Sequence, residues 1–174
     1  TSTLTITVND ALSGSSGVTS LNSILAASDS GVTATISGNY SDLASITAAA
    51  SDTGNSYVAI TVNDAVSASQ GNTVTGLTDN AVVNFNAGVT DAIASLASSG
   101  SVTTNFGNIT TKDTNVTVTI SDSGGTAVNA ADLSAVGGAT TGLVTVSNAV
   151  NISGSQSDVT AALVTSGTKV TAST

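Results

Sequence analysis

The sequence predicts a β-rich solenoid in which parallel strands alternate with short helices on one side, that is, an α/β solenoid. Three observations lead to this prediction. Apolar residues alternate with threonine in several short segments, the ends of these segments recur along the chain, and a short helical pattern follows most of them. Strands that alternate with helices pair in parallel, because the helices serve as crossover connections.

Composition favours a thin folded body over a wide one. Hydrophobic residues make up 40% of the chain and charged residues 7%, a balance that disordered chains do not have. The apolar residues are mostly alanine and valine, and the aromatic residues are Tyr40, Tyr57, Phe85 and Phe106. Small residues fill a narrow core well. The alternative is an all-β sandwich of the immunoglobulin or cadherin-like type, against which the absence of Asn-Gly and Asp-Gly hairpin turns argues.

Five segments show the alternation expected of strands. They are Leu4 to Val8, Val32 to Ile36, Val58 to Val62, Val116 to Ile120 and Leu143 to Val146. The first continues as Val-Asn-Asp-Ala, and the same four residues recur at 62–65. If these strands stack, we expect Val8 to contact Ile36 and Val118 to contact Val146.

Short helices are expected after several strands, because their starts carry capping residues. Asn, Gly or Ser precedes Asp by three positions at Asn39 and Asp42, Gly88 and Asp91, Asn129 and Asp132, and Ser155 and Asp158. The first residue of each pair can cap a helix, and the aspartate meets the positive end of the helix dipole. Leu21, Ile24 and Leu25 indicate an uncapped helix. The stretch 99–115 lacks this pattern and is interpreted as an insertion or a plain β-coil.

We expect residues 1–174 to form a single repeat-built domain. Its approximate units are 1–31, 32–57, 58–80, 81–115, 116–142 and 143–174. No stretch approaches the length of a membrane span, and no leader pattern begins the chain. Since residue 1 is Thr, we interpret the chain as a mature or excised fragment whose targeting signal lies outside it.

The charged residues exclude several kinds of chemistry. All eleven acidic residues are Asp, the two basic residues are Lys112 and Lys169, and the net charge is −9. Without His or Cys, ordinary zinc or haem sites and imidazole catalysis are not expected. Without a basic cluster, neither nucleic acid nor membrane insertion is expected. Lys112 follows two threonines and precedes Asp113, a grouping that we interpret as a solvated loop rather than a nucleophile with its base.

The recurring segments resemble a known kind of repeat. Residues 144–149, followed by 151–163, and the Thr-Val-Thr-Ile-Ser-Asp run that ends at Asp122 are similar to the degenerate Ala/Thr/Asp repeats of very long bacterial, notably marine cyanobacterial, surface proteins. The resemblance implies an extracellular structural or adhesive role. It carries over no catalytic residues.

Two patterns are candidate binding surfaces. Asp10, Asp64 and Asp122 end strands, and stacked strands could gather their oxygens into a weak calcium site, unless each aspartate only closes its own turn. Threonines alternate at Thr3, Thr5 and Thr7, at Thr33 and Thr35, and at Thr117 and Thr119. Such a face suits ice binding if the strands stack in register, and a merely solvated strand otherwise.

We therefore expect a non-enzymatic structural module of an extracellular bacterial surface assembly, or of a self-associating filament. The alternatives are a calcium-dependent or glycan-binding adhesin module and an ice-binding solenoid. No cofactor is expected, with calcium as the one candidate ion. The expected partners are further copies of the chain or adjacent repeats of the same chain. Self-association is assigned to the terminal strands, at Leu4, Ile6, Val8 and Val170.

Overall fold

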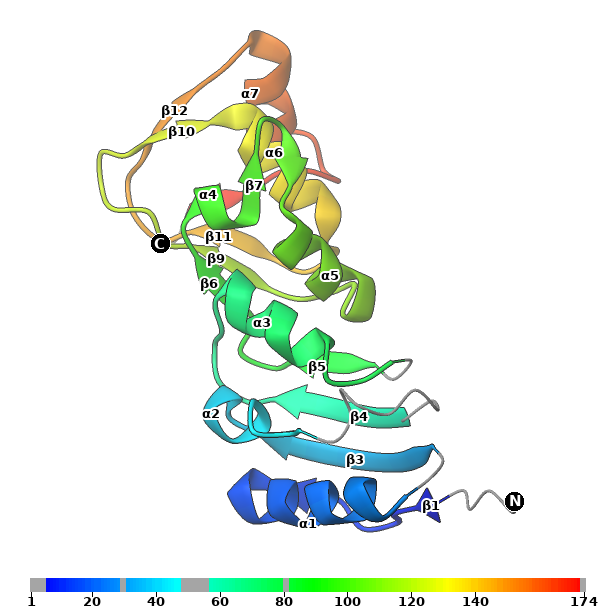
Figure 1. The fold of residues 1–174 in the computed structure, drawn as a ribbon. Coiled ribbons are helices and arrows are strands. Elements are labelled where there is room, and N and C mark those ends of the chain that lie inside the picture. The colour runs from blue at the N-terminus through cyan, green and yellow to red at the C-terminus, as the bar shows by residue number, and fades with distance from the viewer. Residues whose placement is uncertain (1–5, 29–30, 48–56, 80–81, 173–174) are drawn as a thin grey trace. The chain divides into compact units, whose positions relative to one another are not determined.

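The computed structural model describes the chain except for residues 1–5, 29–30, 48–56, 80–81 and 173–174. The protein is a mixed α/β protein with parallel sheets (Figure 1). It forms two compact units. Unit 1 comprises residues 1–64 and 73–87, and unit 2 comprises residues 65–72 and 88–174. Helix α3 (Ala68–Thr75) contributes residues to both.

Unit 1 is built on a parallel sheet. Its strand order is β1-β3-β4-β5, and β2 also pairs with β3. The elements are β1 (Ile6–Thr7), β2 (Leu12–Ser13), α1 (Gly14–Ala27), β3 (Val32–Gly38), α2 (Tyr40–Leu43), β4 (Tyr57–Val62) and β5 (Val83–Phe85). Buried and exposed residues alternate along β3 and β4, as the sequence predicts, and α1 buries Leu21 and Leu25.

Unit 2 holds a second parallel sheet, of order β13-β11-β9-β6, together with the parallel pair β10-β12. Its strands are β6 (Val89–Asp91), β7 (Ala97–Ser98), β8 (Ser101–Val102), β9 (Val118–Ile120), β10 (Ala127–Asn129), β11 (Val144–Val146), β12 (Asn151–Ser153) and β13 (Thr171–Ala172). Its helices are α4 (Ile93–Leu96), α5 (Thr104–Lys112), α6 (Ala130–Ala139) and α7 (Gln156–Leu163).

Successive sheet strands are joined by segments of similar length, each called a coil from here on. In unit 1, Ile6 pairs with Val32, 26 positions later, and Ala34 with Val58, 24 positions later. In unit 2, Val118 pairs with Val144, again 26 positions later. The parallel pairing predicted from the alternation of strands and helices is therefore confirmed within each unit.

A column of valines forms part of the core of unit 2. Val89, Val118 and Val144 lie in register on three neighbouring strands, and Val170 immediately precedes the paired Thr171. All four side chains are at most 4% exposed. Small β-branched residues thus fill the narrow space between the sheet and its helices, as the composition suggests.

The predicted register was wrong by two residues. Val118 pairs with Val144 instead of Val146, and the pairing of Thr7 with Thr33 sets Val8 beside Ala34 rather than Ile36. A shift of two leaves the same side chains facing the core, so apolar alternation cannot distinguish the two registers. The chain then bulges, because Leu12 pairs with Ile36 and residues 8–11 oppose only residues 34–35.

The stretch 99–115 was wrongly interpreted as lacking a helix. It holds α5, whose N-cap Thr103 accepts a hydrogen bond from the backbone N–H of Phe106 at 3.4 Å, and which buries Phe106 and Ile109. Before α5, β7 and β8 form an antiparallel hairpin whose turn residues Ser99 and Gly100 have φ values of 55° and 75°. Positive φ at both turn positions is typical of a type I′ hairpin turn.

Glycine sets the close approach of two neighbouring coils in unit 2. Gly142 leads into β11, and a Cβ at this position would overlap the backbone carbonyl oxygens of Asn115 and Val116 in the preceding coil. At Gly167, by contrast, a Cβ would meet nothing within 4 Å. The two glycines therefore form a matched pair of positions for testing how tightly the coils pack.

We expect Gly142→Ala to lower the free energy of unfolding by about 1–3 kcal/mol, the usual cost of overpacking. The backbone carbonyls that would contact the new methyl group cannot rotate away as a side chain would. Urea denaturation followed by circular dichroism measures the change. Gly167→Ala serves as the control, and equal effects at both positions would contradict the close packing of these coils.

Candidate functional site

Three aspartates, each in a different coil, accept a hydrogen bond from the backbone of the coil that precedes their own. Asp64 accepts a hydrogen bond from the N–H of Tyr40 at 2.8 Å. Asp91 accepts one from the N–H of Ala68 at 3.0 Å, and Asp122 accepts one from the N–H of Ile93 at 2.7 Å. The three donors are the first residues of α2, α3 and α4. We call these three contacts the inter-coil caps.

In α2 and α4 the inter-coil caps supply a capping bond that the local N-cap residue does not make, whereas α3 also has a local capping box between Ser67 and Gln70. The first N–H groups of a helix have no partner within it, and they form the positive end of its dipole. Asn39 and Ala92, the N-cap residues of α2 and α4, make no side-chain capping hydrogen bond. A carboxylate from the following coil takes that place, so the interaction stabilises a helix start and the stacking of two coils together.

The predicted local caps are partly confirmed. Ser155 and Asp158 form a reciprocal capping box at the start of α7, and Asn129 accepts a hydrogen bond from the N–H of Ala131 at the start of α6. Asp132 lies in the first turn of α6, and its carboxylate also accepts a hydrogen bond from Gly100 at 2.6 Å.

Two predicted caps differ from the expectation. Asp42 does lie in the first turn of α2, but Asn39 makes no capping bond there. Asp91 was wrongly placed at the third position of a helix. It ends β6, and α4 begins two residues later at Ile93, because Val89 and Thr90 continue the parallel sheet.

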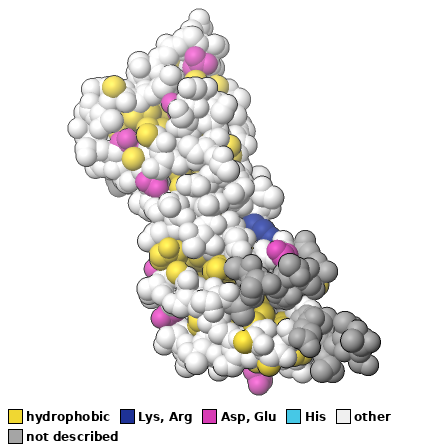
Figure 2. Space-filling model, in the orientation of Figure 1, with side chains coloured by type: hydrophobic (Ala, Val, Ile, Leu, Met, Phe, Trp, Pro, Cys, Tyr) yellow, Lys and Arg dark blue, Asp and Glu magenta, His cyan; other side chains and the backbone are white. Residues whose placement is uncertain are grey.

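The calcium prediction named Asp10, Asp64 and Asp122. The structure places Asp64 and Asp122 in inter-coil caps, whereas Asp10 lies exposed in the bulge at residues 8–11. Among the described residues, no three carboxylates lie close enough together to hold a metal ion. The face shown in Figure 2 has its acidic side chains scattered over the surface. Calcium binding therefore remains a prediction.

The solvated-loop interpretation of Lys112 was wrong. Lys112 lies in the last turn of α5 and is half-buried, and Asp113 is the C-cap residue with only 7% of its surface exposed. The carboxylate of Asp113 accepts a hydrogen bond from the N–H of Asn115 at 3.3 Å. Asp113 thus helps to end the helix. The sequence could have indicated this helix through Thr103, an N-cap type three residues before Phe106.

Threonines form a row across the sheet of unit 2. Thr90, Thr119, Thr145 and Thr171 lie in register on four neighbouring parallel strands. The hydroxyls of Thr145 and Thr171 donate to the carbonyls of Val118 and Val144 in the preceding coil, at 3.4 and 3.2 Å. In unit 1, Thr7 pairs with Thr33 but Thr35 pairs with Ala59, so its threonine row is shorter. Thr3 and Thr5 lie outside the described residues.

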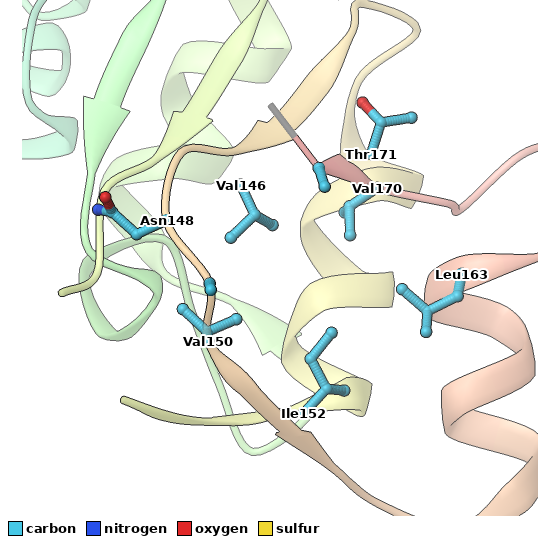
Figure 3. A pocket seen from close by; sticks show the side chains of 9 residues that line it. Val146, Asn148, Val150, Ile152, Leu163, Val170 and Thr171 are labelled. Atoms are coloured by element: carbon cyan, nitrogen blue, oxygen red, sulfur yellow. The ribbon is translucent and has the colours of Figure 1, made fainter. Parts of the chain in front are cut away.

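The terminal coil of unit 2, residues 144–172, holds an apolar cavity of about 180 Å³. Its lining includes Val150, Ile152, Leu163 and Val170. In Figure 3, Ile152 extends toward the cavity from β12 and Leu163 from α7. A cavity of this size has room for one or two apolar side chains.

A second cavity, of about 420 Å³, is polar and lies at the C-terminal end of α6, with Lys169 on its lining. Two hydroxyls on its lining donate hydrogen bonds to main-chain carbonyls of the preceding coil. Thr140 donates to the carbonyl of Val116 at 2.7 Å, and Thr141 donates to that of Thr114 at 3.1 Å. The lining therefore ties α6 to the preceding coil, and we assign it no ligand.

The residues assigned to self-association differ in accessibility. Leu4 lies outside the described residues. Ile6 and Val8 are half-buried, whereas Val170 is only 4% exposed. Val170 therefore packs inside its own unit, and its side chain is not offered to a partner.

Comparison with models of protein families, with curated protein sequences and with solved structures gives no significant match. Each helix within the described residues is too short or too polar to cross a lipid bilayer.

We expect Asp122→Ala to lower the free energy of unfolding by about 0.5–2 kcal/mol, the usual cost of losing a helix cap. The start of α4 has no local side-chain cap to replace the carboxylate. Thermal and urea denaturation measure the loss, with Asp10→Ala as the control. Both variants are also measured with added calcium. If calcium stabilises the wild type and this gain disappears in Asp122→Ala, the carboxylate is a metal ligand.

Proposed function

We propose that the chain is a non-enzymatic structural module, an α/β solenoid that forms part of an extracellular bacterial surface assembly. The observation that carries the proposal is the inter-coil cap. Successive coils pair in parallel, and aspartates of one coil cap the helix starts of the coil before it. Charged side chains, which in an enzyme would face a substrate, here bind the protein's own backbone.

Sequence and packing both support a scaffold role. Serine and threonine make up 58 of the 174 residues, and in unit 2 the hydroxyls of Thr140, Thr141, Thr145, Ser147 and Thr171 donate to main-chain carbonyls of the preceding coil. Repeat proteins of this kind derive their stability from each repeat and its contact with the next. Such an array is extended by adding coils, which suits a long surface protein better than a compact enzyme.

The extracellular setting rests on composition. The chain is rich in serine and threonine, and its repeats resemble those of long bacterial surface proteins. A net charge of −9 keeps such a chain soluble and repels anionic surfaces. These properties favour a surface or released protein.

Removing one whole coil tests the solenoid. Val118 and Val144 occupy the same place on neighbouring strands, so deleting residues 118–143 joins Thr117 to an equivalent strand. We expect this variant to keep a cooperative thermal transition and the circular dichroism of a mixed α/β protein. Deleting only residues 118–130 breaks the register, and we expect that variant to unfold. Equal loss of structure in the two deletions would contradict the proposal.

Ice binding is a second candidate function, favoured by the row of Thr90, Thr119, Thr145 and Thr171. Neighbouring strands lie about 4.8 Å apart, so the row repeats hydroxyl and methyl groups at a regular spacing. A flat, regular surface of this kind can order water. Ser121 and Ser147 directly follow β9 and β11, two positions after Thr119 and Thr145, and add hydroxyl groups beside the row.

An ice recrystallisation assay tests this second function. We expect Thr145→Tyr to abolish any inhibition by the wild type, because the bulky ring interrupts the flat row. Thr111→Tyr, on the exposed side of α5, is the matched control and should leave inhibition unchanged. If the wild type does not slow the growth of ice crystals, ice binding is contradicted and the structural proposal stands alone.

A further inference from the structure

We draw no further inference here: the strongest candidate, the surface patch on the outer face of the unit 2 sheet where Leu143 is 60% exposed two positions before Thr145 of the threonine row, belongs to the surface already considered for ice binding, and nothing in the structure shows what else covers it.

Discussion

Parallel pairing between successive coils is the constraint on which the rest of this structure depends. A parallel strand pair cannot be closed by a tight turn, so the chain must cross over and return in every coil. Short helices make that return, and a short helix has few bonds of its own with which to satisfy its first N–H groups. The carboxylates of Asp64, Asp91 and Asp122 meet this need from the following coil. The register of the strands therefore determines which aspartate reaches which helix start, so these features of the structure depend on one another.

Features that depend on local pattern could be predicted from the sequence. The alternation in β3 and β4, the capping box at Ser155 and the mixed α/β class follow from side-chain periodicity and capping chemistry. The register could not be predicted, because a shift of two residues keeps Val118 facing the core. Helix α5 was not predicted, because its first turn carries no acidic residue and its apolar face consists only of Phe106 and Ile109.

In the candidate site, too, the local features could be predicted from the sequence and the long-range contacts could not. The sequence marks Asp64 and Asp122 as strand-end residues, yet their hydrogen-bond donors lie 24 and 29 positions earlier. Nothing local identifies such partners. The repeated Val-Asn-Asp-Ala segments illustrate the difficulty: at 62–65 the aspartate caps a helix, whereas at 8–11 the segment forms a bulge. Identical tetrapeptides thus hold different structural positions, because the strands beside them differ.

The direction of the inter-coil caps has a consequence for biosynthesis. The acceptor always follows the donor in the chain, so the amide of Tyr40 leaves the ribosome before the carboxylate of Asp64 that will bind it. The helix starts at Tyr40, Ala68 and Ile93 each gain this hydrogen bond only when the next strand of the chain has been made. During synthesis these three helix starts therefore lack their carboxylate partners until 23 to 29 further residues have been added.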